Sequence, residues 1–171
     1  MHQPYYYDPA TGRSAMPWVR LHATRGYFDQ IVLLDDYPSI RQTFNYVPSL
    51  LKQIEEYARG SVTDVFLDYG MKPAADLTPD DRRFILWNFF MVNWETMINP
   101  HPRYKELLQA RGATVTESTM PDAARRFSER DIRDLQVWFN LAWFGHQACR
   151  RYPELAEMKK TSPEVSRVLD I

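Results

Sequence analysis

Apolar and polar positions follow a helical spacing on both sides of one short β-like stretch in the first third of the chain. Residues 19–38, "VRLHATRGYFDQIVLLDDYP", carry an apolar face and end at Pro38, which predicts a helix. A second helix is predicted to begin at Pro48, where the missing N–H costs nothing, and to end at Gly60. Between them, residues 40–47 are rich in β-branched and aromatic side chains, which predicts one strand.

The middle of the chain contains the strongest helix start. Thr78, Pro79 and Asp81 supply a cap, a first-turn proline and an acid at the third position. We expect this helix to run to Pro100. Nine of the eleven residues in 84–94 are apolar, so most of its sides need to be covered by protein. The run is much shorter than the roughly 20 residues of a membrane-spanning helix, so no membrane partner is expected.

The last third predicts further helices. "PRYKELLQARG" is a short amphipathic helix ending at Gly112, and Ser128 with Asp131 is a second capping pattern, which starts "ERDIRDLQVWFNLAWFG". The tail "SPEVSRVLDI" starts one more helix. An extended loop is expected at residues 1–20, a short helix and a loop at 61–77, and a polar loop or weak helix at 113–127. One strand cannot make a stable sheet, so these elements suggest a piece of something larger.

Composition narrows the class of protein. The 171 residues are 44% hydrophobic and 25% charged, which is typical of a soluble globular domain. A net charge of −1 provides no basic field for nucleic acid. The single cysteine, Cys149, excludes an internal disulfide, and with no visible signal peptide it indicates a cytoplasmic protein. Aromatic residues reach 14%; such rings can stack on sugars, but composition alone favours a core role.

Few residues carry recognisable chemistry. The four histidines and Cys149 have no zinc-like spacing, no glycine-rich phosphate loop is present, and no serine lies in a nucleophile-elbow pattern. We therefore expect no metal and no cofactor. The acids lie mostly on amphipathic helix faces or at caps, so spacing alone identifies no catalytic pair.

Polar residues near loops are better candidates for ligand contacts. Asn45 follows the predicted strand, where ligands of α/β folds bind, although it could equally bond to loop backbone. Trp18 and His22 flank the first loop, and Arg20 between them could hold an anionic or hydroxyl group or a helix carboxylate. Core roles are favoured for Trp138, Asn140 and Trp143.

Four segments together resemble a known family. In order along the chain they are "HQPYY", "PWVRLHA", "TFNYVPSLL" and "DLQVWFNLAWF". The sequence resembles the N-terminal part of the family 57 glycoside hydrolases, the relatives of α-amylase, amylopullulanase, 4-α-glucanotransferase and branching enzyme. "HQP" is a weak match by itself, whereas "PWVRLHA" and "WFNLAWF" in one chain are a strong one.

The resemblance implies a (β/α)7 barrel that acts on α-1,4- and α-1,6-linked glucans with retention of configuration. A glutamate nucleophile and an aspartate acid/base would lie on later strands, and no acid in this chain matches those motifs. His2 would line the sugar subsite at the cleavage point, with Gln3 and Pro4 shaping the turn.

The fold class we expect is therefore α/β. Residues 1–171 would be an N-terminal part of the catalytic domain without the first strand and the later barrel strands, mostly α-helical with one or two strands. We expect it to be inactive alone, without catalytic residues of its own. Its partners would be α-glucan or maltooligosaccharide and the rest of the catalytic domain. The residues expected to line the sugar cleft are His2, Gln3, Trp18, Arg20, His22 and Asn45. Two alternatives remain: a free-standing helical interaction module, and a non-catalytic α-glucan-binding unit.

Overall fold

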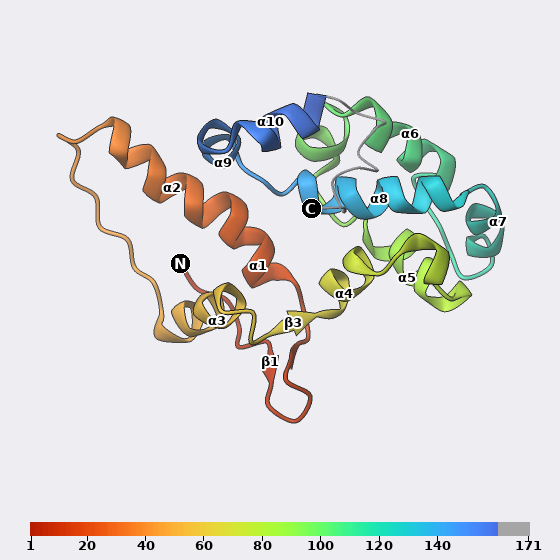
Figure 1. The fold of residues 1–171 in the computed structure, drawn as a ribbon, viewed down its shortest axis with the longest axis horizontal. Coiled ribbons are helices and arrows are strands. Elements are labelled where there is room, and N and C mark those ends of the chain that lie inside the picture. Colours follow the sequence, from red (N-terminus) through yellow and green to blue (C-terminus); the bar gives the residue numbers. More distant parts are fainter. Residues whose placement is uncertain (161–171) are drawn as a thin grey trace. The chain divides into compact units, whose positions relative to one another are not determined.

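The chain forms two compact units in the computed structural model, which describes residues 1–160 (Figure 1). The first unit combines residues 1–68 with 143–153, and the second combines residues 69–142 with 154–160. Helices dominate both units, and one small sheet lies in the first. The helix expected in "SPEVSRVLDI" lies outside the described residues.

A long helical segment opens the first unit. It runs through four consecutive elements: α1 (Trp18–His22), the π-helical η1 (Ala23–Tyr27), α2 (Phe28–Val32) and the 3₁₀ turn η2 (Leu33–Asp36). The helix predicted for residues 19–38 is thus confirmed, with a π turn around Gly26. Val19 and Leu21 are fully buried, whereas Ile31 and Leu33 are exposed, so only the first turns pack into the core.

The strand predicted for residues 40–47 is wrong. After η2 the chain runs back to α3 (Pro48–Ala58) without regular structure, and Ile40 is 52% exposed (Figure 1). A β-branched run forms a strand only where a neighbouring strand supplies hydrogen bonds along its length. Here the Met1 amino group donates to the Asn45 carbonyl and Val47 N–H donates to the Met1 carbonyl, which is too little for a ladder. The helix from Pro48 is confirmed, and Gly60 follows it with φ +67°.

The sheet forms instead in segments that were expected to be loops. β1 (Tyr7–Asp8) pairs antiparallel with β2 (Arg13–Ser14), which pairs parallel with β3 (Thr63–Asp64). The described residues therefore hold three short strands rather than one or two, and each has only two residues. A strand of two residues has no alternation long enough to recognise in a sequence. β3 leads directly into α4 (Val65–Met71).

The first unit is closed by α9 (His146–Arg151) packing against α2. The Asp29 carboxylate accepts hydrogen bonds from the backbone N–H groups of His146 and Gln147, at 3.0 and 3.1 Å. This carboxylate caps the first turn of α9, and it lies where a Cβ on Gly145 would be. Glycine is required at position 145 because of this close approach.

In the second unit, α5 (Pro79–Asn88) begins with the predicted capping box between Thr78 and Asp81. The helix was expected to reach Pro100 but ends at Asn88. The Asn88 amide donates to its own helix at the Phe84 carbonyl, and Asn93 caps a new π-helical turn, η4 (Trp94–Ile98). Asparagine side chains compete with helical backbone bonds, so the two of them divide the apolar run.

Around α5 lie the remaining elements of the second unit. They are η3 (Ala74–Asp76), α6 (Pro102–Arg111), α7 (Met120–Arg125), α8 (Glu129–Leu141) and α10 (Pro153–Lys160), whose first residue belongs to the first unit. The capping box of Ser128 and Asp131 is confirmed at the start of α8. Trp138 is 1% exposed, which confirms its core interpretation. The Asn140 amide donates to Gln136 O at 2.9 Å, as expected of a satisfied amide, but Asn140 is half-buried.

Candidate functional site

Two of the predicted site residues, Trp18 and His22, lie against the Trp143 ring. Trp18 and His22 lie one turn apart on α1, and the centre of each ring approaches the Trp143 ring, at 6.2 and 5.3 Å respectively. The His22 contact is edge-to-face, a favoured geometry for aromatic pairs. Trp143 is 7% exposed, and its indole N–H has no hydrogen-bond partner among the described residues.

Further rings extend this cluster along the first unit. Tyr27 lies 6.1 Å from the His22 ring, and Tyr46 lies 6.0 Å from Tyr27 in an edge-to-face contact. We call these five side chains, Trp18, His22, Tyr27, Tyr46 and Trp143, the aromatic row. Apart from Trp143 they are half-buried, so their rings are partly accessible to a ligand.

A predicted amide lies at the edge of the aromatic row. The Gln3 amide nitrogen donates to the Tyr27 hydroxyl at 3.3 Å, and the Tyr6 hydroxyl donates to the Gln3 amide oxygen at 3.1 Å. The structure thus brings Gln3, Trp18 and His22 into one continuous set of contacts, although they come from the N-terminal segment and from α1.

Burial favours the neutral forms of two groups of the aromatic row, the His22 imidazole and the Tyr46 phenol. Burial lowers the pKa of His22, and the nearby Arg25 charge acts in the same direction. Burial, with a smaller effect of Tyr27, raises the pKa of Tyr46. A neutral imidazole has one donor and one acceptor nitrogen, and a neutral phenol can also do both. The row therefore combines aromatic rings with the His22 imidazole, whereas the Tyr46 hydroxyl is buried without a hydrogen-bond partner among the described residues.

Arg20 points to a different set of partners. Its Nε and Nη2 atoms donate to the two oxygens of the fully buried Asp64 carboxylate, at 2.9 and 3.3 Å. The Tyr57 hydroxyl donates to the same carboxylate at 3.0 Å, and burial is the main cause of its raised pKa. Leu67 N–H also donates to Asp64, at 2.8 Å, so Asp64 caps α4. Of the roles considered for Arg20, binding a helix carboxylate is the one this geometry provides.

This buried network borders a cavity. Arg20 and Tyr57 line a mainly apolar space of about 440 Å³, together with side chains that include Val19, Ile54 and Leu67. The cavity is within the usual range for small-molecule sites, but Arg20 and Tyr57 are already engaged with Asp64.

The other two predicted residues lie apart from the aromatic row. His2 and Asn45 are exposed, and neither side chain has a hydrogen-bond partner among residues 1–160. Asn45 does not follow a strand, so the argument from the carboxyl end of a strand no longer applies to it. Their sugar contacts remain predictions. Within the same residues, no group of three or more acids, histidines or cysteines is placed to hold a metal ion.

Sequence reasoning missed Tyr27 and Tyr46. Its core assignment of Trp143 is confirmed, since Trp143 is 7% exposed, but its contacts with Trp18 and His22 were not foreseen. No spacing connects position 143 to position 18, because chain folding alone brings them together. The nearest signal was the family segment "TFNYVP", which contains Tyr46 beside the residue that was chosen, Asn45.

Partly exposed rings with neutral hydrogen-bonding groups form a surface suited to sugars, whose rings have apolar faces and hydroxyl edges. Such a surface is expected in a protein that acts on carbohydrates, and the comparison with known protein families agrees with this class. Residues 1–162 match the model of glycosyl hydrolase family 57, and because this is nearly the whole chain, the protein belongs to that family. No curated protein and no solved structure matched the chain. Among residues 1–160, no helix is long and apolar enough to cross a membrane.

Proposed function

We propose that this chain binds α-glucan, such as a maltooligosaccharide, along the aromatic row, as part of a retaining α-glucan-acting glycoside hydrolase. The observation that carries the proposal is the unbroken set of ring contacts from Trp18 through Trp143 and His22 to Tyr27, with the Gln3 amide beside it. Membership of glycosyl hydrolase family 57 supports the class of substrate.

The chemistry of the row explains how it would hold a sugar. The apolar face of a pyranose ring would stack on Tyr27 or Trp18, and its hydroxyls would bond to the Gln3 amide and the His22 imidazole. His2, the subsite residue that the family resemblance implies, is adjacent to Gln3 in the sequence. We propose that His2 completes the hydrogen bonding when sugar is bound.

Binding can be tested by electrophoresis in gels that contain amylose. We expect the wild-type chain to be retarded and Tyr27→Ala to lose most of the retardation. Tyr152→Ala is the matched control, because Tyr152 is a tyrosine of the same unit, 45% exposed and outside the aromatic row. Circular dichroism would check that both variants fold. Equal retardation of wild type and Tyr27→Ala would contradict the proposed site.

We also propose that the chain does not cleave glucan alone. A retaining mechanism needs two carboxyl groups about 5 Å apart, with a raised pKa on the acid. Asp131 and Asp134 both bind Arg103 Nη2, at 2.5 and 2.7 Å, so they form a close pair, but the guanidinium neutralises it. Burial favours a higher pKa of Asp131, yet hydrogen bonds from Ser128 and Arg103 outweigh it and lower that pKa. This is the opposite of what a general acid needs.

The test is the release of reducing ends from maltoheptaose by the purified chain. We expect no release above the blank. Release that disappears in Asp131→Asn but persists in a surface control, Asp122→Asn, would show that this pair is catalytic.

A second role is favoured by exposed apolar side chains on the first unit. Ile31, Leu33, Tyr37 and Ile40 are each more than 40% exposed, along α2, η2 and the segment after them. Surfaces of this kind mark protein contacts. We propose that these side chains pack on the rest of a (β/α)7-type catalytic domain. We also propose that the protein is cytoplasmic, because its single cysteine, Cys149, cannot form an internal disulfide. Light scattering should show self-association of the isolated chain that Ile31→Lys with Leu33→Lys removes; a monodisperse wild-type chain would contradict this role.

A further inference from the structure

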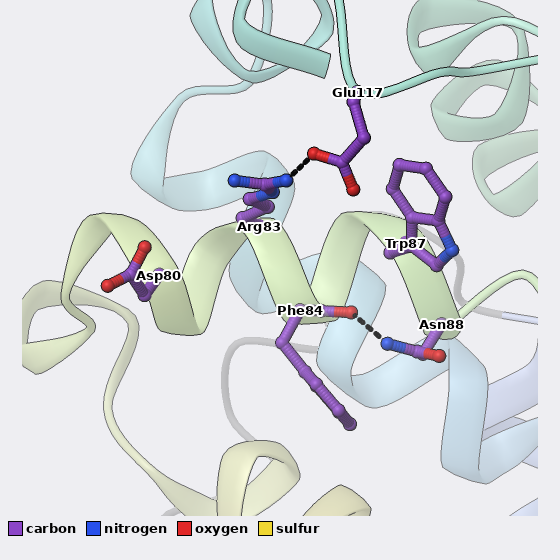
Figure 2. Close-up of a pocket in the computed structure, with 6 residues that line it drawn as sticks. All are labelled: Asp80, Arg83, Phe84, Trp87, Asn88 and Glu117. Carbon is purple, nitrogen blue, oxygen red and sulfur yellow. Dashed lines mark hydrogen bonds and ion pairs between the residues drawn. The ribbon is translucent and has the colours of Figure 1, made fainter.

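The second unit carries a separate aromatic surface on α5. A cavity of about 390 Å³ opens there, lined by Asp80, Arg83, Phe84, Trp87, Asn88 and Glu117 (Figure 2). None of these residues belongs to the aromatic row, and all lie within residues 69–142. We call this cavity the Trp87 pocket. Its volume falls within the usual range of small-molecule sites, about 300–1,000 Å³.

Trp87 is one of the exposed large side chains of the apolar run 84–94, together with Met91 and Trp94. Its neighbours Ile85 and Leu86 are fully buried, whereas Trp87 is 37% exposed. Figure 2 shows its indole ring rising from α5 beside the Glu117 side chain. A large ring left partly in water, with charged groups around it, offers a flat apolar face to a ligand that also needs hydrogen bonds.

Three of the polar groups of the Trp87 pocket have partners within the second unit. Arg83 on α5 forms an ion pair with Glu117, which comes from the segment between α6 and α7 (Figure 2). The Asn88 amide nitrogen donates to the Phe84 carbonyl at 2.9 Å, which orients the amide. An arginine has five N–H donors and a carboxylate has about four acceptor positions, so the ion pair leaves both with capacity for a ligand.

The charges of the Trp87 pocket select the kind of ligand. One guanidinium is accompanied by two carboxylates, from Asp80 and Glu117, so the pocket has no excess positive charge for a phosphate. It is also too polar at its rim for an aliphatic ligand. A neutral polyhydroxylated ring fits both conditions, because it can stack on Trp87 and exchange hydrogen bonds with the Arg83–Glu117 pair.

We infer that the Trp87 pocket is a second α-glucan contact, in which one glucose unit stacks on Trp87 and its hydroxyls bond to Arg83, Glu117 and Asn88. The identity of the sugar rests on the proposed function, whereas the existence and location of the site rest on the pocket alone. The chain would then hold glucan at two places, one in each unit.

The number of bound ligands tests this inference. Isothermal titration of the full chain with maltotriose should give two molecules bound. Trp87→Ala should leave one, by weakening its site about tenfold or more, which corresponds to about 1.4 kcal/mol. Trp94→Ala is the matched control, since Trp94 is 36% exposed in the same unit but does not line the pocket. Glu117→Gln, at a side chain that is 74% exposed, should weaken the same site without a risk to folding.

The outcomes separate this inference from the proposed function. One molecule bound, lost in Tyr27→Ala but unaffected by Trp87→Ala and Glu117→Gln, would overturn the second site and leave the first. One molecule bound, lost in Trp87→Ala but not in Tyr27→Ala, would support the Trp87 pocket and overturn the aromatic row. No maltotriose bound by the wild-type chain would overturn both.

Discussion

Replacement of Asp64 by alanine should destabilise the first unit strongly. The Asp64 carboxylate has 0% exposure, and within residues 1–160 it accepts hydrogen bonds from Nε and Nη2 of Arg20, the Tyr57 hydroxyl and Leu67 N–H. The substitution removes the carboxylate from a guanidinium that is only 16% exposed, and it also removes the cap of α4. Both effects act on groups that water reaches poorly.

The magnitude follows from the burial. Removing one partner of a buried ion pair costs about 3–5 kcal/mol, and a lost helix cap costs about 1 kcal/mol. Because Arg20 keeps some access to water, we expect the low end, about 3–4 kcal/mol in total. For a chain of this size that lowers the unfolding temperature by roughly 6–16 °C. Asp64→Asn keeps an acceptor for Leu67 N–H and should cost less.

Urea unfolding, followed by circular dichroism, gives the free energies needed. Adding Arg20→Met to Asp64→Ala should recover part of the loss, because the double variant no longer buries the guanidinium without the Asp64 carboxylate. The double variant should also bind maltooligosaccharide as the wild type does if Arg20 is structural. A loss below about 1 kcal/mol in Asp64→Ala, or additive effects of the two changes, would refute the reasoning.

Three further results are expected. Gly145→Ala should lower the free energy of unfolding by about 1–3 kcal/mol, because the added Cβ would overlap the Asp29 carboxylate. Gly26→Ala, where the space is open, should be neutral or stabilising. Equal effects of the two substitutions in urea unfolding would contradict this reasoning. Burial lowers the pKa of His22, so the unfolded chain binds the imidazole proton more readily than the folded chain does. The free energy of unfolding should therefore fall as pH drops through about 6.5. His22→Gln should make this pH dependence weaker, and an unchanged pH dependence would contradict the assignment to His22. Thr43→Gly should change the free energy of unfolding by less than about 0.5 kcal/mol, since residues 40–47 form no strand. A larger loss of stability would instead support a strand in this segment.

Helix starts could be read from the sequence because their signals are local. The capping boxes at Thr78 and Ser128 and the proline at position 48 act within one turn, so neighbouring residues determine them. The break after Asn88 was missed because the apolar run continues through it, although the side-chain bonds of Asn88 and Asn93 are also local. Family membership was equally accessible, since the four segments lie in order along the chain.

What the sequence by itself determined is therefore the mostly helical character, several helix starts and the family. Only the tertiary structure decided which residues meet. β2 pairs with β3 across some fifty residues, and Trp143 joins Trp18 and His22 from the far end of the chain. The tertiary structure also places the Arg20 guanidinium against the Asp64 carboxylate, and it provides no partner strand for residues 40–47. Strand pairing and site geometry depend on contacts between distant segments, and no local pattern encodes those contacts.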